Sequence, residues 1–333
     1  MSNWSELKQA LSLELSNSEA AKSFNSPLQL CSLDHKCAIA VVGPDSKKFL
    51  QGQLTCNLDD VSPSQWQLGA HCNHKGRMIS SFRASALSDE HILLTLRHNI
   101  SDSALAALAK YAIFSKVELS LNDKLMGLGL AGEQAEQQLS AWELPIEEGN
   151  SAYKDGVHVL NIGKGRFELW AEQENIKNLL EQLKSEATLV DSSHWKLLDI
   201  QAGIAEVEAG VEEAIIPQML NFNELDGINY QKGCYTGQEI IARMQYRGNV
   251  KRHTVRLVEG ITESQVELAS LYSGMSVYGA NKQAVGELVN FAKGPQGLEA
   301  LAVVKDGAEQ TALALSEDGP WNFTIEPLPY AIT

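Results

Sequence analysis

Short apolar runs separated by turn residues fill the chain after Gly248. Runs of this length and spacing are typical of antiparallel strands joined by tight turns. The pattern therefore predicts a small antiparallel β-barrel domain at residues 251–333, with residues 1–250 forming a separate region. The six predicted strands are 253–258, 275–278, 284–291, 300–304, 311–315 and 323–325.

Residues 1–250 combine strand-like and helix-like patterns. Compact apolar runs, bounded by turn residues, predict strands, and apolar residues at helical spacing predict helices between some of them. Because strands and helices do not alternate strictly, the pattern favours an α+β fold with two similar lobes. The predicted strands include 37–42, 66–72, 78–87, 91–97, 157–162 and 166–171, and the predicted helices include 4–15, 101–111, 134–142, 175–185 and 192–203.

Composition limits the classes of function. The chain has 333 residues, 44% of them hydrophobic and 21% charged, and its formal net charge is −15. Proteins that bind nucleic acid strongly usually carry a row of basic residues that neutralises phosphates. Because the net charge of this chain is negative, strong direct binding to nucleic acid is not expected. The first six residues lack the basic region and apolar core of a signal peptide, and no apolar run approaches the roughly 20 residues of a membrane helix. We therefore expect a cytoplasmic protein with no membrane partner.

The cysteines argue against a disulfide framework. There are five of them, an odd number, and no C-x-x-C occurs, which fits a reducing compartment. His71, Cys72 and His74 form the one cluster that invites a metal interpretation. Zinc sites normally need two ligand pairs at set spacing, and a second pair is not evident, so we predict no metal site.

Cys234 lies between Gly233 and Gly237, with Lys232 two positions before it. Residues 238–246 predict a helix, which would place Cys234 just ahead of a helix N-terminus. Helix N-termini and nearby cations lower the pKa of a thiol, and both Lys232 and Arg243 could contribute. A buried structural cysteine in a glycine turn is the alternative. The polar residues around the thiol favour a functional role.

The run from Lys232 to Glu239 resembles the signature of the YgfZ family of folate-binding, tRNA-modifying proteins, which are related in fold to the glycine-cleavage aminomethyltransferase. The resemblance implies two α+β lobes, a C-terminal barrel and a bound tetrahydrofolate or derivative. It also implies a role in maturing or repairing iron–sulfur enzymes, including those that thiolate or methylthiolate tRNA, as partners. Further matching segments are 49–55, 73–78, 110–117, 216–218 and 326–330.

The same resemblance implies candidate folate contacts. Trp195 begins the pattern Trp195-x4-Ile200-x2-Gly203, which is similar to the segment that carries a ligand-binding tryptophan in this family. Core packing of a helical tryptophan is the alternative. Tyr235 in the cysteine motif and Arg243 on the following helix are the other candidates. Arg243 could offer a cation to the acidic tail of folate. The alternative is a solvated helix end, where a cation is favoured.

Three positions depart from the family pattern. Lys36 stands where relatives often carry a second tryptophan, and it could pair with a glutamate tail. Gln201 stands where relatives often carry glutamate, and its amide offers one acceptor oxygen in place of two. Ser80 and Ser81 stand where the aminomethyltransferases carry an Asp pair. Serine cannot carry the proton at neutral pH, so aminomethyl transfer is not expected.

Three functions follow from these features. The first is a folate-binding protein that supports iron–sulfur enzymes and, indirectly, tRNA modification. The second is a folate-dependent one-carbon transferase with Cys234 as nucleophile or base. The third is a folate-free interaction module for iron–sulfur proteins. A turnover assay with formaldehyde-loaded tetrahydrofolate distinguishes the second function, and a ligand titration distinguishes the third.

Overall fold

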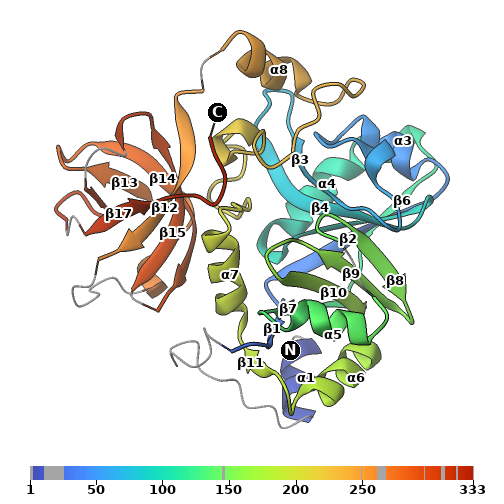
Figure 1. Ribbon diagram of the computed structural model, residues 1–333. Helices are drawn as coiled ribbons and strands as arrows, with labels where there is room; N and C mark the ends of the chain where they lie inside the picture. The colour runs from blue at the N-terminus through green and yellow to red at the C-terminus, as the bar shows by residue number, and fades with distance from the viewer. Residues whose placement is uncertain are drawn as a thin grey trace. The chain divides into compact units, whose positions relative to one another are not determined.

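The computed structural model describes residues 3–10, 26–144, 147–248, 250–260, 268–295, 297–308, 312–319 and 322–332 (Figure 1). The chain divides into two compact units, each built from separated segments. The first unit contains Met1–Leu50, Asn57–Gln67 and Phe82–Trp195, and the second contains Gln51–Cys56, Leu68–Ser81 and Lys196–Thr333. The domain boundary near residue 250 is a different division and stays a prediction.

A six-stranded sheet forms part of the first unit. Its order is β11-β1-β7-β10-β9-β8, with β1 parallel to β11 and antiparallel to β7. The amphipathic helix α6 buries Ile176, Leu180 and Leu183, which recur at helical spacing, against this sheet. The strands are β1 (Gln29–Ser32), β7 (Leu125–Ala131), β8 (Ser151–Lys154), β9 (Val157–Asn161), β10 (Arg166–Glu172) and β11 (Thr188–Val190).

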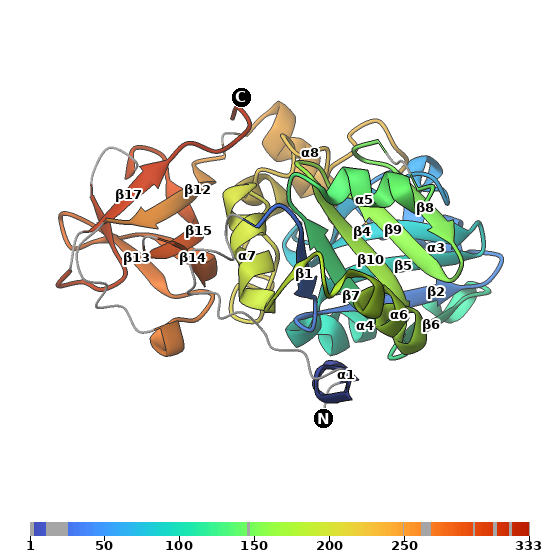
Figure 2. The ribbon, with the colours of Figure 1, turned by 60° about the horizontal axis from the view of Figure 1, so that its bottom comes forward.

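Helices cover one face of this sheet (Figures 1 and 2). Alternate residues of β10, Phe167 and Leu169, join a single core cluster with side chains of α1, α5 and α6. Successive side chains of a strand point to opposite faces, so Glu168 and Trp170 lie on the other face. The helices are α1 (Asn3–Ala10), α5 (Ala135–Ala141) and α6 (Gln173–Leu183); the predicted helix at 4–15 extends past the described residues.

Two glycines shape the face that carries Glu168. A Cβ added at Gly129 would lie 2.4 Å from the ring of Trp195, and one added at Gly127 would lie 2.9 Å from the ring of Trp170. Gly129 pairs with Glu168 in the strand register, and Gly127 pairs with Trp170. The bare backbone of β7 therefore admits two indole rings to the face of the sheet that also carries a buried carboxylate.

A five-stranded sheet has the order β3-β4-β5-β2-β6. The strands predicted at 37–42, 66–72, 78–87 and 91–97 are confirmed here as β2, β3, β4 and β5. The strands are β2 (Lys36–Val42), β3 (Gln67–Cys72), β4 (Met78–Ser88), β5 (His91–Arg97) and β6 (Glu118–Leu121). The helices beside them in the sequence are α3 (Ser46–Gln51), α4 (Ser101–Ala109), and the 3₁₀ turns η1 (Leu58–Asp60), η2 (His98–Ile100) and η3 (Ala112–Phe114).

The predicted C-terminal barrel is confirmed. Six strands of the second unit close in the order β12-β15-β14-β13-β16-β17 around an apolar core that includes Leu257, Val277 and Phe323. The strand predicted at 311–315 is shorter than expected, and Thr311 lies outside the described residues. The strands are β12 (Arg252–Glu259), β13 (Ser276–Gly279), β14 (Ala284–Lys293), β15 (Leu298–Lys305), β16 (Leu313–Ala314) and β17 (Phe323–Glu326).

The remaining helices connect these parts along the chain. They are α7 (Ser192–Gln201), η4 (Pro217–Leu220), α8 (Gln238–Tyr246) and η5 (Leu268–Ser270). Among the described residues, every helix is too short or too polar to cross a membrane. The two α+β lobes and the barrel together confirm the predicted fold class.

Candidate functional site

Cys234 lies on an irregular loop that leads into α8. It is exposed, and it precedes the first helical residue, Gln238, by four positions. Gly237 caps the helix with a φ of +84°, and a Cβ there would lie 2.5 Å from the carbonyl oxygen of Asn73. Both the positive φ and the close approach require glycine at this position. The motif glycine thus seats the loop against the turn that follows β3.

Lys232 anchors this loop. Its Nζ donates hydrogen bonds to the carbonyl oxygens of Leu54 and Cys56, both at 2.7 Å. The same ammonium lies 5.1 Å from the centroid of the Tyr235 ring, within the range of a cation–π contact. The sequence suggested that Lys232 would act on the thiol. The structure instead shows its charge bound to backbone oxygens, so its visible role is to hold the loop.

A second set of bonds attaches the other side of the loop to the same segment. The amide N–H of Thr236 donates to the carbonyl of Gly52 at 3.2 Å, and its hydroxyl donates to Oε1 of Gln53 at 3.2 Å. The segment 51–56 and the cysteine motif, far apart in sequence, therefore form one structure. The exposed thiol is carried on a loop that is fixed at both sides.

Tyr235 and Arg243 have different environments. Tyr235 is buried, and its hydroxyl has no hydrogen-bond partner among the described residues. Burial is the largest cause of a pKa well above the usual range for this phenol, so Tyr235 stays neutral. Arg243 is exposed in the last turn of α8, where a cation interacts favourably with the helix dipole.

The other four cysteines are less accessible than Cys234. Cys31, Cys56 and Cys72 are buried, and Cys37 is partly buried. Burial raises the pKa of the Cys37 thiol to about 11 and raises that of Cys72 further. A buried thiol with a raised pKa is a poor nucleophile at neutral pH.

Native alkylation should therefore single out Cys234. With iodoacetamide at pH 7.5, we expect peptide mass spectrometry to show complete labelling of Cys234 while Cys31, Cys37, Cys56 and Cys72 stay mostly unlabelled. Protein unfolded in urea provides the control, in which all five should react. Equal labelling of the five thiols in the native protein would contradict the exposure that the structure assigns.

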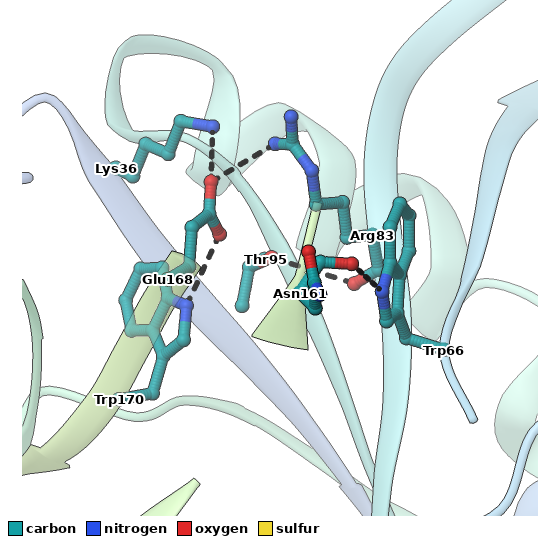
Figure 3. A network of polar contacts seen from close by, with 7 residues as sticks. All are labelled: Lys36, Trp66, Arg83, Thr95, Asn161, Glu168 and Trp170. Atoms are coloured by element: carbon teal, nitrogen blue, oxygen red, sulfur yellow. Dashed lines mark hydrogen bonds and ion pairs between the residues drawn. The ribbon is translucent and has the colours of Figure 1, made fainter. Parts of the chain in front are cut away.

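A buried charge cluster joins the two sheets within the first unit (Figure 3). Oε1 of Glu168, on β10, lies 2.9 Å from Nζ of Lys36 on β2 and 3.1 Å from Nη1 of Arg83 on β4. Oε2 of the same carboxylate accepts a hydrogen bond from the indole of Trp170 at 3.2 Å. The three charged side chains are at most 2% exposed. We call Lys36, Trp66, Arg83, Glu168 and Trp170 the Glu168 cluster.

Trp66 completes the cluster. Its ring centroid lies 5.9 Å from the guanidinium carbon of Arg83, and its Nε1 donates to the carbonyl of Asn161 at 2.9 Å. The hydroxyl of Thr95 donates to the backbone carbonyl of Arg83 at 3.4 Å (Figure 3). Sequence reasoning missed Trp66, Arg83 and Glu168. The available signal was a glutamate in the middle of an apolar strand, because a buried charge requires a partner.

Trp195 is buried on the same face of the six-stranded sheet. Its ring packs against Gly129, whose register partner is Glu168. The side chain is fully buried, and its indole N–H has no hydrogen-bond partner in the part of the chain that the structure describes. An unsatisfied buried donor costs about 1–3 kcal/mol, so this N–H is a candidate contact for a polar ligand.

Gln201 and the two serines occupy defined polar positions in the second unit. Nε2 of Gln201 donates to Glu299 at 3.0 Å, and Glu299 also pairs with Arg256 at 2.6 Å. Ser80 and Ser81 are both buried, and the hydroxyl oxygen of Ser81 accepts a hydrogen bond from an amide N–H at 2.8 Å. Both of these buried side chains are therefore neutral.

The predicted site residues fall into two groups. Lys36 and Trp195 lie in the first unit, where Lys36 reaches Glu168 from β2 and Trp195 packs on the face of the six-stranded sheet that carries Glu168. The second unit brings Lys232, Cys234 and Tyr235 together on one loop, which α8 follows with Arg243, and it also contains Gln201.

His71, Cys72 and His74 do not converge. His71 and Cys72 are successive residues of β3, so their side chains point to opposite faces, and His74 is exposed beyond the strand. Burial lowers the pKa of His71 to about 4. Within the described ranges, no group of three or more His, Cys, Asp or Glu residues is placed to hold a metal ion.

The chain is similar in sequence to proteins of a known family. The family model described as "GCVT N-terminal domain" matches residues 14–183. The chain is 33% identical to tRNA-modifying protein YgfZ of Cronobacter sakazakii, over 94% of this chain and 96% of the relative. It is 34% identical to the protein of that name from Yersinia pseudotuberculosis, over 92% of this chain and 93% of the relative.

A solved structure agrees with the fold. Glycine cleavage system aminomethyltransferase T from Bartonella henselae superimposes with a TM-score of 0.70 at 18% identity, over 85% of this chain and 80% of that chain. This likeness bears on the fold alone. The identity and coverage among the curated relatives, together with the match to the family model, show that the chain belongs to the family of the tRNA-modifying protein YgfZ.

Proposed function

We propose that the chain is a cytoplasmic folate-binding protein that supports the maturation or repair of iron–sulfur enzymes. Through those enzymes it supports the thiolation and methylthiolation of tRNA, with Cys234 as its functional thiol. The observation that carries the proposal is the exposure of Cys234 on a loop that Lys232 fixes through two backbone carbonyls. The names of the relatives support the link to tRNA modification.

The loop favours contact between the thiol and a partner protein. An exposed thiol on a fixed loop can approach a group on another molecule with little rearrangement. The ammonium of Lys232 is occupied by carbonyl oxygens, so the loop gives little support to Lys232 as an acid or base beside the thiol. We propose that the iron–sulfur cluster is bound by the partner enzyme, and that the Cys234 thiol contacts that enzyme.

An indirect effect on tRNA fits the charge of the chain. With a net charge of −15, the bulk field opposes a polyanion. Each phosphate contact needs a cation, and affinity falls steeply as salt rises. The proposal therefore gives the chain no strong contact with tRNA itself.

The first unit contains two of the proposed folate contacts, Trp195 and Lys36. The unsatisfied N–H of Trp195 would donate to a pterin heteroatom, while its buried ring packs on Gly129. Reduced folate, when bound, would carry one-carbon units. Lys36 remains a proposed contact for the acidic tail, although contact would require it to share or exchange the carboxylate of Glu168.

The proposed contacts from the second unit are Gln201, Tyr235 and Arg243. Nε2 of Gln201 already donates to Glu299, so a ligand would meet its amide oxygen more readily. The unsatisfied hydroxyl of Tyr235 can donate to a ligand atom. Exposed Arg243 can pair with a carboxylate of the tail without losing a partner that the structure shows.

Titration with tetrahydrofolate tests the ligand. We expect saturable quenching of tryptophan fluorescence, and calorimetry should show Trp195→Phe binding about 2- to 13-fold more weakly, because loss of one hydrogen bond typically costs about 0.5–1.5 kcal/mol. Phenylalanine keeps most of the packing on Gly129 but lacks the N–H. Trp142→Phe is the control, because Trp142 is a partly buried tryptophan that packs against the core cluster on the helix-covered face of the six-stranded sheet. Equal affinity of the two variants would remove Trp195 from the site.

A further inference from the structure

The turn formed by residues 110–116 exposes an unusual amount of apolar surface. Tyr111 is 50% exposed, Ile113 is 79% exposed and Phe114 is 97% exposed. Single exposed apolar residues are common on proteins, but three within four positions form a patch, and exposed patches mark interaction surfaces. We call residues 110–116 the Phe114 turn.

Hydrogen bonds hold the backbone of the Phe114 turn. Ser115 N–H donates to the carbonyl of Ala112 at 2.8 Å and closes the 3₁₀ turn η3. Lys116 N–H donates to the Asp45 carboxylate at 2.8 Å, and its carbonyl accepts from the N–H of Asp45 at 3.4 Å. The turn is therefore tied to the neighbouring loop, and its side chains project from a fixed support.

The charge around the turn differs from that of the whole chain. Lys110 and Lys116 flank the apolar residues, and both are exposed. No Asp or Glu occurs from Ser103 to Val117, although the chain carries 42 acidic residues and a net charge of −15. The turn thus combines an apolar surface with two lysines, beside the Asp45 carboxylate that accepts from the N–H of Lys116.

We propose that the Phe114 turn docks a partner protein that presents an apolar pocket rimmed with carboxylates. Phe114 would fill the pocket, because aromatic anchors in desolvated pockets carry most of the energy of many interfaces. Lys110 and Lys116 would face the rim and favour acidic partners. A fixed turn loses little conformational freedom on binding. This surface lies outside the proposed folate and thiol residues, and the inference does not rest on the proposed function.

RNA and a membrane surface fit the charges and shape of the turn less well than an acidic protein does. Two lysines can neutralise only about two phosphates, so RNA would bind weakly and against the bulk charge. Membrane-surface binding normally uses a long amphipathic helix, whereas η3 contains three residues. A second copy of this chain is itself acidic, with a net charge of −15, and would also suit the two lysines, so self-association is a separate outcome of the test.

Photo-crosslinking of the full-length chain tests the surface. The chain is expressed in a host that lacks its own copy, with p-benzoylphenylalanine in place of Phe114 or, as a matched control, in place of Tyr272, which is 63% exposed on the barrel unit. We expect a discrete adduct from position 114 and none of the same mass from position 272. The crosslinked peptide of the partner should contain apolar residues flanked by Asp or Glu.

Binding of the purified partner decides the result. The double variants Ile113→Ser/Phe114→Ser and Lys110→Glu/Lys116→Glu should each weaken binding at least tenfold, while Tyr272→Ser binds like the unmodified chain and all variants keep its melting temperature. Absence of an adduct at position 114 would overturn the proposal. An adduct with a second copy, with RNA or with lipid would also overturn it, as would a protein partner whose affinity ignores both double variants.

Discussion

Glu168→Gln is expected to lower the free energy of unfolding by about 3–5 kcal/mol, because it leaves buried cations without the carboxylate that they contact. Lys36 and Arg83 both reach Oε1 of Glu168, and all three side chains are at most 2% exposed. A glutamine at this position keeps the shape and one acceptor oxygen but carries no charge. The two cations would then repel each other in a site that water does not reach.

Urea denaturation at pH 7, followed by fluorescence and circular dichroism, measures this loss. Glu143→Gln is the matched control, because Glu143 makes an ion pair of the same length, 2.9 Å, with Lys154 but is 85% exposed. Exposed ion pairs contribute little, so the control should unfold like the unmodified chain. Adding Lys36→Met to Glu168→Gln should recover part of the loss. Equal midpoints for the Glu168 and Glu143 variants would show that the buried cluster contributes no stability.

Cys234→Ala is expected to abolish the function of the chain without unfolding it. The thiol is exposed, and the loop that carries it is held by Lys232 and Thr236 rather than by the cysteine side chain. The variant should therefore keep the melting temperature of the unmodified chain. In a host that lacks the chain, it should fail to restore the specific activity of an iron–sulfur enzyme that modifies tRNA.

Two further variants separate the thiol from its support. Cys37→Ala removes a thiol from β2 and should restore that activity fully. Lys232→Met removes the bonds to Leu54 and Cys56, so it should lose function together with some stability. Full restoration by Cys234→Ala would show that the motif serves the structure alone.

Local patterns were sufficient to predict the architecture. The short strands after residue 250 were predictable because each is a short apolar run followed by turn residues, and they close into a barrel. The helix α6 was predictable because Ile176, Leu180 and Leu183 define one apolar face within a single segment. Both signals lie within a few residues of the element that they specify.

The Glu168 cluster was not predictable because its members are distant in the sequence. Lys36 and Glu168 are separated by 132 positions, and no local pattern connects them. Lys36 was read as a ligand contact from its position in the family pattern, whereas the structure gives it a protein carboxylate as partner. A glutamate inside an apolar strand could have indicated a buried charge that needs a partner, but the sequence does not identify the cations.

The hydrogen bonds that hold the cysteine loop could not be predicted from the sequence, for a different reason. The sequence places Lys232 two residues from Cys234, and this proximity suggested an electrostatic effect on the thiol. In the structure Lys232 binds two backbone carbonyls from a segment 176 and 178 positions away. Every residue has a backbone carbonyl oxygen, so a hydrogen bond to one cannot be predicted from the side chains in the sequence.

Nucleoside mass spectrometry of tRNA from a host that lacks the chain is the most direct test of the central claim. We predict loss of thiolated or methylthiolated nucleosides made by iron–sulfur enzymes and normal levels of modifications made without clusters. The unmodified chain should restore the lost nucleosides, and Cys234→Ala should not. A gel titration at physiological salt should show no shift of tRNA by the purified chain. Equal loss of cluster-dependent and cluster-free modifications, together with tight and saturable tRNA binding, would contradict the account and make the chain a direct tRNA enzyme.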